Sequence, residues 1–398
     1  MSNLEELIER LCPDGVEYES LIDLCDVLYG FPCDASKFND DMIGLPLVRI
    51  RDVLEGKSDT YTIESVPEEY KIHSGDLLVG MDGNFHVGIW KDIEAILCQR
   101  VCRISSKDNE VLLDGFLNHL IEPIMKKIEL GKQSGTVKHL LAKDIKAIKL
   151  PVPPLEVQRE IVRILDNFTF LTAELAAELA ARQKQYEYYR DLLLTFKSNE
   201  STILNERTNE LELSGAIRWM KLGDIADIGT GNGNTNEGLD TGKYPFFVRS
   251  QDIKYKNEYD FDETAIITSG DGVGVGKIFH FVSGKYALHQ RAYRVHITSD
   301  NVLPKYFFYY FKNSFLTYIS KASFHSSVTS IRRPMMINFP VPVPPLVVQQ
   351  RIVDILDRFD TLCNDISSGL PAEIEMRQKQ YEYYRDKLLS FKELKKEA

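Results

Sequence analysis

The chain has 398 residues, which exceeds one ordinary domain and predicts two or three. Its composition, 43% hydrophobic and 27% charged, is typical of a globular protein and argues against disorder along the whole length. The net charge of −11 argues against a free-standing, salt-driven nucleic-acid binder, but allows local basic loops or a DNA binder inside a larger assembly. We expect a cytoplasmic protein, because the sequence shows neither a membrane-spanning apolar run nor the basic start of a signal peptide.

A long internal repeat determines the predicted architecture. The ten residues RQKQYEYYRD at 182–191 recur unchanged at 377–386, and PVPPLEVQREIVRILDNF at 151–168 resembles PVPPLVVQQRIVDILDRF at 342–359. Weaker similarity relates VRIRDV (48–53) to VRSQDI (248–253) and CQRVCRI (98–104) to HQRAYRV (289–295). The chain therefore consists of two divergent domains, each followed by a near-identical tail.

The first divergent domain, 1–150, predicts a mixed α/β fold with a β-like run at 77–79 and a helix at 114–129. Asp76 and Asp82 stand beside glycines, where Asp commonly forms turns, as does Asp271 in the second domain. Cysteines stand at 12, 25, 33, 98, 102 and 363 without a CxxC pair, so we expect reduced, buried thiols rather than a zinc site.

The first tail, 151–198, predicts one long helix, since no Pro or Gly occurs from 158 to 196. Apolar residues follow steps of four and three along it, a heptad-like stripe that one helix cannot bury alone. Within it, LTAELAAELAA repeats Leu171, Leu175 and Leu179 at four-residue spacing. This repeat indicates either simple helix propensity or a segment that adjusts the length of the helix.

The second domain, 199–341, predicts strands at 244–248 and 265–267 and a helix at 304–321. Its polar loop GTGNGNTNEG (229–238) lacks the pattern of a P-loop or of a dinucleotide fingerprint. The second tail, 342–398, carries the same apolar stripe, and SSGLP at 367–371 should break or bend its helix. The fold class that we expect is α+β, with two pseudo-symmetric mixed α/β domains separated by an antiparallel pair of long helices.

The residues favour binding over catalysis. Nucleophile-elbow, HExxH and methyltransferase motifs are missing, and the histidines do not cluster at metal-ligand spacing, so we expect no catalytic or metal site. Gln99-Arg100 and Gln290-Arg291 occupy equivalent positions, and Gln and Arg are side chains that read base edges, although a shared structural ion pair is an alternative. The candidate DNA-contacting residues are Arg49, Arg51, Asn84, His86, Gln99, Arg100, Lys132, Ser134, Thr136, Lys138, His139, Arg249, Gln251, Lys277, Gln290, Arg291, His325, Ser326, Ser327, Arg332 and Arg333.

Two domains that alternate with two like helical tails, each ending in RQKQYEYYRD, resemble the specificity subunit of type I restriction-modification enzymes. The run LTAELAAEL is most similar to the IC-like branch of that family. The resemblance implies that each domain is a target-recognition domain for half of a split sequence in double-stranded DNA. It also implies that the tails set the length of the gap between the two half-sites and bind two methyltransferase subunits. The motor/endonuclease subunits would join the complex through these methyltransferase subunits. The predicted partner-binding residues are Gln158, Arg159, Gln183, Lys184, Tyr186, Arg190, Gln349, Gln350, Arg351, Gln378, Lys379, Tyr381 and Arg385.

The resemblance further implies a non-catalytic chain without its own cofactor, with S-adenosylmethionine, ATP and Mg in the partner subunits. Three alternatives stay open at this point. The chain could be the specificity subunit of a type IIB-like system, a DNA methyltransferase or nuclease with unrecognised motifs, or a scaffold that does not bind DNA.

Overall fold

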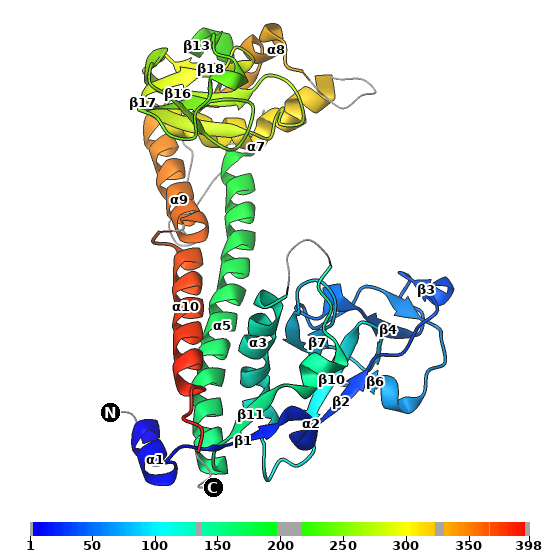
Figure 1. Cartoon of the computed structure of the whole chain (residues 1–398). Coiled ribbons are helices and arrows are strands. Elements are labelled where there is room, and N and C mark those ends of the chain that lie inside the picture. Colours follow the sequence, from blue (N-terminus) through cyan, green and yellow to red (C-terminus); the bar gives the residue numbers. More distant parts are fainter. Residues whose placement is uncertain (1–2, 133–136, 197–216, 323–329, 366, 395–398) are drawn as a thin grey trace, which may run out of the picture. The chain divides into compact units, whose positions relative to one another are not determined.

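The structure is a computed structural model of the chain, and it describes residues 3–132, 137–196, 217–322, 330–365 and 367–394 (Figure 1). The chain divides into two compact units, Met1–Leu175 with Ile374–Ala398, and Ala176–Glu373. The boundaries of the units lie inside the tails, because each divergent domain packs against helices from both tails. The predicted segments 1–150, 151–198, 199–341 and 342–398 thus follow the repeat in the sequence and not the compact units.

The described part of the first unit holds three sheets. A four-stranded antiparallel sheet has the order β2-β10-β7-β8, and a five-stranded mixed sheet has the order β3-β5-β4-β9-β6, while β1 pairs with β11. The strands are β1 (Glu17–Ser20), β2 (Cys25–Tyr29), β3 (Phe38–Asn39), β4 (Leu45–Val48), β5 (Tyr61–Thr62), β6 (Lys71–Ile72), β7 (Leu77–Gly80), β8 (Val87–Ile89), β9 (Ala95–Leu97), β10 (Val101–Ser106) and β11 (Lys149–Val152).

The described part of the first unit has four helices outside the tails, of which α3 packs on the four-stranded sheet. They are α1 (Asn3–Leu11), α2 (Leu21–Leu24), α3 (Asp114–Leu130) and α4 (Ala142–Lys146), with short 3-10 turns at Ala35–Lys37, Ile50–Asp52 and Glu68–Tyr70. Phe116 and Leu120, one helical turn apart on α3, share a buried cluster with Val79 of β7 and Ile104 of β10. The predicted helix at 114–129 and strand at 77–79 are thereby confirmed.

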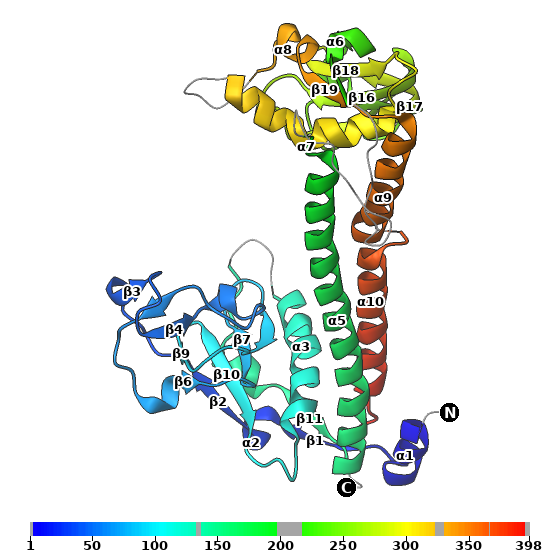
Figure 2. The same cartoon turned by 180° about the vertical axis from the view of Figure 1, so that it is seen from behind.

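The second unit repeats this layout with one larger sheet, seen from behind in Figure 2. Its six strands have the order β13-β18-β16-β17-β14-β15, all antiparallel neighbours except β14 and β17, and β12 pairs with β19. The strands are β12 (Arg218–Lys221), β13 (Ala226–Thr230), β14 (Tyr244–Phe247), β15 (Lys254–Lys256), β16 (Phe261–Ser269), β17 (Phe279–Leu288), β18 (Ala292–Ile297) and β19 (Pro340–Val343). The helices are α6 (Leu222–Ile225), α7 (Pro304–Ala322) and α8 (Arg333–Ile337), with a 3-10 turn at Thr235–Glu237.

The tails form the helices α5 (Leu155–Leu194), α9 (Leu346–Asn364) and α10 (Leu370–Leu388). The first tail is one continuous helix, as predicted. The second tail is broken after Asn364, and α10 restarts with Pro371 in its first turn, so the predicted break at SSGLP is confirmed. None of the helices in the described ranges has the length and apolar composition that a membrane span requires.

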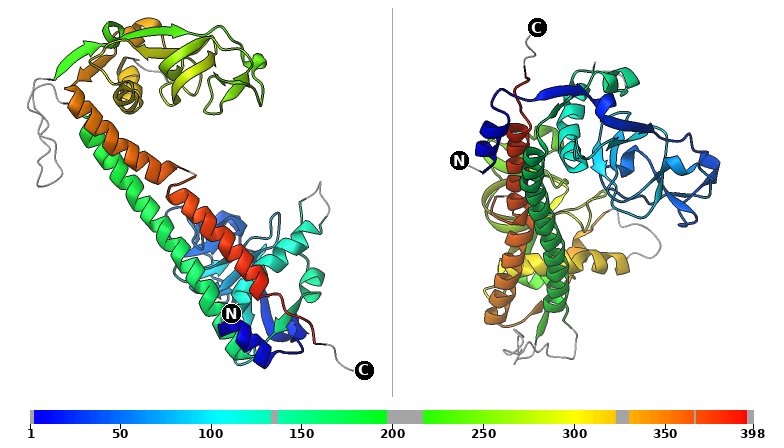
Figure 3. Two further views of the ribbon diagram at one scale, coloured as in Figure 1. Left: turned by 90° about the vertical axis from the view of Figure 1, so that its left-hand side faces the viewer. Right: turned by 90° about the horizontal axis from the view of Figure 1, so that it is seen from below.

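Each unit contains its own antiparallel contact between the tails. In the first unit, Phe168 of α5 stacks on Tyr384 of α10 with ring centroids 5.3 Å apart, and α10 lies alongside α5 (Figure 3). In this unit, Arg10 of α1 forms an ion pair with Glu156 at the start of α5, and Glu5 of α1 forms one with Lys387 at the end of α10. The start of α5 therefore lies near the end of α10, so the two stretches run in opposite directions.

In the second unit, Phe359 of α9 contacts Tyr186 and Tyr189 of α5, with ring centroids 6.1 and 5.7 Å apart. The decapeptide 182–191 therefore packs beside the domain that follows it, and the copy at 377–386 packs beside the first domain of the chain. The expected antiparallel pairing of the tails is confirmed within each unit.

Candidate nucleic-acid interface

A tight turn after β7 brings together residues from three parts of the first unit. The Met81 amide donates to the carbonyl of Arg100 at 2.8 Å, and the Leu140 amide donates to the carbonyl of Met81 at 2.7 Å. Asp82 lies next in the chain, followed by Gly83 with φ of 74°, a conformation that favours glycine. These backbone bonds fix the Asp82 side chain between the segment before α4 and the residue that precedes β10.

The Asp82 carboxylate contacts two cationic or protonatable side chains. Its Oδ1 atom lies 2.7 Å from Nδ1 of His139, and its Oδ2 atom lies 3.4 Å from Nε of Arg100. The Arg100 side chain is 63% exposed while the Asp82 side chain is 20% exposed, so a mostly buried carboxylate pairs with an arginine at the surface. Arg100 also adopts φ of 76°, which is unusual for a residue with a side chain and marks a constrained position.

The second unit contains the same turn. The Gly270 amide donates to the carbonyl of Arg291 at 2.9 Å, and the Ile331 amide donates to the carbonyl of Gly270 at 2.8 Å. Asp271 follows, and Gly272 has φ of 81°. Gly270, Asp271 and Arg291 thus stand where Met81, Asp82 and Arg100 stand in the first unit.

Asp271 holds two arginines. Nη1 of Arg249 donates to Oδ1 at 2.7 Å, and Nη1 of Arg291 donates to Oδ2 at 2.9 Å. Burial acts to raise the pKa of Asp271, but the hydrogen bonds from Arg249 and Arg291 outweigh it and hold the pKa below its usual value. The carboxylate is therefore ionised near neutral pH, and the alternative of an arginine in a buried structural ion pair does not describe Arg291, which is 62% exposed.

A second polar contact fixes Gln290, the residue before Arg291, in the second unit. Nε2 of Gln290 donates to Oδ1 of Asn234 at 2.6 Å. Beside it, Nδ1 of the buried His289 accepts a hydrogen bond from the Arg291 amide at 3.0 Å, which leaves Nε2 to donate to Thr235 at 3.2 Å. The backbone that carries Gln290 and Arg291 is therefore hydrogen-bonded to the loop GTGNGNTNEG (229–238).

A surface hollow of about 270 Å³ adjoins the Asp271 turn. It is lined by Thr235, Val248, Arg249, Ser250, Asp271, Gly272, Val273 and Gly274. At the tip of the turn Val273 is 96% exposed, and the equivalent tip residue of the first unit, Asn84, is also exposed. The polar Asn84 and the apolar Val273 thus occupy equivalent, solvent-facing positions.

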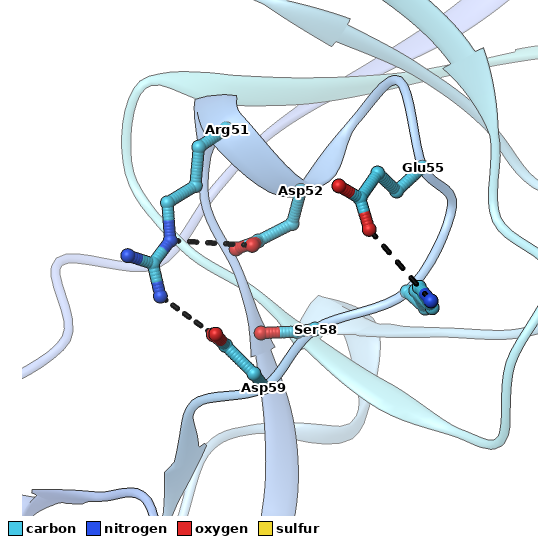
Figure 4. Close-up of a pocket in the computed structure, with 6 residues that line it drawn as sticks. Arg51, Asp52, Glu55, Ser58 and Asp59 are labelled. Carbon is cyan, nitrogen blue, oxygen red and sulfur yellow. Dashed lines mark hydrogen bonds and ion pairs between the residues drawn. The ribbon is translucent and has the colours of Figure 1, made fainter. Parts of the chain in front are cut away.

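The first unit has a different hollow, of about 480 Å³, beside the 3-10 turn after β4 (Figure 4). Arg51 points to Asp59 and Asp52, at 2.6 and 3.4 Å, and acidic side chains outnumber basic ones among the lining residues. Arg49 is also drawn into this group, with Nη2 donating to the hydroxyl of Thr60 at 2.6 Å. The two predicted DNA-contacting arginines are therefore largely neutralised by neighbouring carboxylates.

The lysines predicted to contact phosphates lie in ion pairs within the first unit. Lys132 lies 2.5 Å from Asp144, and Lys138 lies 3.2 Å from Glu129, and both lysines are about a quarter exposed. The structure leaves the other described candidates exposed or partly exposed, namely His86, Gln99, Gln251, Lys277, Arg332 and Arg333. Ser134, Thr136, His325, Ser326 and Ser327 lie outside the described residues.

Three residues predicted on exposed faces of the tails are buried, so this part of the prediction is wrong. Gln158 and Gln349 are fully buried because they satisfy backbone groups before α3 and α7. Arg385 is 4% exposed because it is ion-paired with Glu122 of α3 at 2.7 Å. The exposed or partly exposed residues of the set are Arg159, Gln183, Lys184, Tyr186, Arg190, Gln350, Arg351, Gln378, Lys379 and Tyr381.

Sequence reasoning missed two kinds of residue. Asp82 and Asp271 were interpreted only as turn formers, although in both domains an Asp-Gly pair stands in the chain before the Gln-Arg pair. Tyr188 and Tyr383, at equivalent places in the decapeptide, are 65% and 64% exposed, and neither was among the predicted partner-binding residues. In the part of the chain that the structure describes, no group of three His, Cys, Asp or Glu side chains is placed to hold a metal ion.

The fold and the two turns define a protein with two copies of one α/β domain, each presenting its own exposed polar side chains. The family model described as "Type I restriction modification DNA specificity domain" matches residues 13–182 and 217–376, and the chain belongs to this family. The chain is 37% identical over 273 residues to the specificity subunit of the type I restriction enzyme EcoR124I/EcoR124II from Escherichia coli. That match covers 61% of this chain and 63% of the relative.

Solved structures agree on the fold. A crystal structure of the S subunit of a type I restriction-modification system from M. genitalium covers 94% of this chain and 96% of its own, with a TM-score of 0.59 and 14% identity. A second structure, from work on complex assembly and conformational transition of the type I R-M system, covers 95% of this chain and 98% of its own, with a TM-score of 0.55 and 18% identity.

Proposed function

We propose that this chain is the specificity subunit of a type I restriction-modification enzyme and reads a split target in double-stranded DNA. One observation carries the proposal: the same hydrogen-bonded turn presents Gln99-Arg100 in one unit and Gln290-Arg291 in the other. Around this shared frame, the exposed residues differ. Asn84 corresponds to Val273 at the tip of the turn. Two copies of one frame with unlike exposed side chains suit the reading of two unlike half-sites.

The charge of the chain fits a subunit that works inside an assembly. The net charge is −11, and Arg49, Arg51, Lys132 and Lys138 are paired with acidic neighbours. Non-specific binding to DNA comes mostly from neutralised phosphates, and acidic neighbours in the chain already neutralise these four side chains. We therefore expect the partner subunits to supply much of the phosphate contact, while this chain supplies the base contacts.

The catalytic work belongs to partners in this proposal. The chain would carry no cofactor, and the methyltransferase subunits would bind S-adenosylmethionine and methylate adenine. The motor/endonuclease subunits would use ATP and Mg and join through the methyltransferase subunits. The proposal places the complex in the cytoplasm, where chromosomal and incoming DNA are accessible. Purified chain that bound S-adenosylmethionine by itself would argue instead for an enzyme.

The decapeptide supports two equivalent docking sites for methyltransferase subunits. Both copies expose the same side chains, namely Gln183, Lys184 and Tyr188 in α5 and Gln378, Lys379 and Tyr383 in α10. An exposed tyrosine flanked by polar residues is a common anchor of protein interfaces, because its ring buries a large area and its hydroxyl group can stay hydrogen-bonded. Native mass spectrometry should show two methyltransferase subunits per chain for the wild type.

Substitution of one anchor tests the docking sites separately. Tyr188→Ala and Tyr383→Ala should each shift the complex toward one methyltransferase subunit per chain, with similar losses, because the two sites have the same sequence. The exposed Met376→Ala, one residue before the decapeptide, serves as a control that should keep two. If the wild type held only one subunit at saturating partner, this part of the proposal would be rejected.

Methylome sequencing tests the function itself. A host that expresses this chain with its methyltransferase subunit should carry methyladenine in a motif of two specific parts separated by a gap of fixed length. Methylation in one continuous motif, or a motif that is unchanged when this chain is omitted, would contradict the proposal.

A further inference from the structure

The carboxylates Asp82 and Asp271 lie under exposed arginines at equivalent positions of the two units. Both are about one-fifth exposed, and each is held by a turn whose next residue is a glycine with positive φ. The two domains have diverged in most of their loops, yet they keep this carboxylate, the glycine and the arginine in the same hydrogen-bonded frame. A shared fold explains the glycine and the backbone bonds, but it does not require an exposed arginine held by a carboxylate.

The carboxylate bears on what the arginine can bind. A DNA phosphate is negatively charged, and a carboxylate about 3 Å from the guanidinium group would repel it and cancel much of the attraction. A base edge is neutral, so the carboxylate costs little there, and it limits the arginine to a small part of its rotamer space. A preorganised side chain loses less conformational entropy when it binds. The pairing with Asp82 or Asp271 therefore favours a base edge over a phosphate as the ligand of the arginine.

The free donors suit one base in particular. Asp271 takes one N–H group from Arg291 and one from Arg249, out of the five that each guanidinium group carries. The remaining donors of one guanidinium group can contact two acceptors at once. In the major groove, guanine offers two neighbouring acceptors, O6 and N7, whereas adenine offers an acceptor beside a donor. Arg291 is 62% exposed and Arg249 lines the hollow of about 270 Å³, so both guanidinium groups are open to the edge of a base.

We infer that Asp82 and Asp271 are positioning residues that orient Arg100 and Arg291 to read one guanine in each half-site. The inference rests on the proposed function, since it assumes that each unit reads its own part of the target. Asp271 would act on the second unit's half-site alone, and Asp82 on the first unit's half-site alone. Neither carboxylate needs to touch the DNA.

The experiment compares Asp271→Asn with Asp82→Asn in the full complex of this chain with its methyltransferase subunits. The amide keeps the size of the side chain but weakens the charge-assisted bonds to the arginines. For Asp271→Asn we expect the preference for guanine at one position of one half-site to fall about tenfold, with the other half-site unchanged. For Asp82→Asn the change should move to the other half-site. Methylome sequencing reads both outcomes in the same data.

Asp240→Asn is the matched control, because it also removes one negative charge from the second unit and breaks an exposed ion pair, with Lys254 at 2.8 Å. It should leave both half-sites unchanged. The half-site that stays unaltered in each variant also shows that the chain is folded and assembled. If Asp271 had only a structural role, its substitution would impair folding or assembly and so affect both half-sites. Loss of all methylation in both Asp→Asn variants would therefore overturn the inference.

Two further outcomes would overturn it. If the arginines contact phosphates, the loss of the negative charge in Asp271→Asn should tighten binding to all DNA and steepen its salt dependence, with no change in the preferred base. A wild-type motif in which either half-site lacks a G·C pair would also exclude the inference and leave the proposed function intact. A wild type without any two-part motif would reject the proposed function itself.

Discussion

Gln158 and Gln349 make the same three hydrogen bonds in the two units. Oε1 of Gln349 accepts from the Leu303 amide at 2.8 Å, and its Nε2 donates to the carbonyls of Asn301 and Pro344. Gln158 bonds in the same way to Leu113, Val111 and Pro153. Each glutamine therefore joins the first turn of a tail helix to the loop that precedes α3 or α7, and no shorter side chain could reach all three groups.

Replacement of Gln349 by Ala should destabilise the second unit. The substitution leaves the buried carbonyl of Pro344 and the partly buried amide of Leu303 and carbonyl of Asn301 without their partner, and each group that stays unsatisfied costs about 1–3 kcal/mol. We expect a clear fall in the urea midpoint followed by circular dichroism. Gln350→Ala is the control, because Gln350 is exposed and bonds only to Asp354 on its own helix, so its effect should stay within about 0.5 kcal/mol. Equal effects of the two substitutions would show that the three hydrogen bonds of Gln349 do not stabilise the second unit.

His119 should make the stability of the first unit depend on pH. Its ring lies between Asp166 of α5 and Tyr381 of α10, at 2.9 and 3.0 Å, with Arg385 and Glu122 nearby. Burial lowers the pKa of His119 from its usual value of 6.5, against the opposing effect of Asp166. The unfolded chain therefore binds more protons, so this contribution to the free energy of unfolding is present above about pH 6.5 and is lost as the pH falls below it.

Thermal unfolding at pH 7.5 and 5.5 checks this expectation. His119→Gln keeps a polar side chain but does not titrate, so the difference in Tm between the two pH values should be smaller in the variant than in the wild type. The two proteins are otherwise identical, so the contributions of all other groups cancel in the comparison. An identical pH dependence would show that His119 does not contribute.

The tips of the two turns should determine a base next to the guanine. Asn84 can bond to adenine through its amide group, while Val273 can contact only an apolar group such as the methyl group of thymine. Val273→Asn should therefore raise the preference for adenine at one position of the second unit's half-site by about tenfold. Methylome sequencing would show this change. A change in the half-site of the first unit, or in the gap, would contradict the assignment.

The four-residue repeat in α5 should set the gap between half-sites. The helix is continuous through Leu171, Leu175 and Leu179. Insertion of Thr-Ala-Glu-Leu after Leu171 would lengthen it by about 6 Å, which is between one and two base-pair steps. We expect a longer gap with both half-sites unchanged, and a changed half-site in the methylome would refute the length-adjuster interpretation.

The tails and much of the domains could be predicted from the sequence because their signals are local. A run without Pro or Gly and a stripe at helical spacing predicted α5, and Pro371 marked the start of α10. The helices α3 and α7 and the strands β7 and β14 were also predicted at nearly their observed bounds, whereas the predicted strand at 265–267 covers only the middle of β16. These elements follow from periodicity, which is read within about ten residues.

The arrangement of the candidate site could not be predicted, because it depends on contacts between distant residues. No local pattern indicates that Asp271 pairs with Arg249 and Arg291, which lie 22 and 20 residues away. The burial of Gln158 was missed for a similar reason. A glutamine on a helix next to Arg159 looks like a solvent-facing residue until the loop before α3 is placed over it.

The identical decapeptide serves opposite partners: residues 182–191 support the second domain of the chain, and 377–386 support the first. Genetic exchange within the coding sequence of this element would therefore join a new recognition domain to an already compatible surface. Each copy of the decapeptide would keep its own side chains, whichever domain was joined to it. A lineage could in this way acquire a new DNA target in one recombination event, without any compensating substitution in its supporting helices.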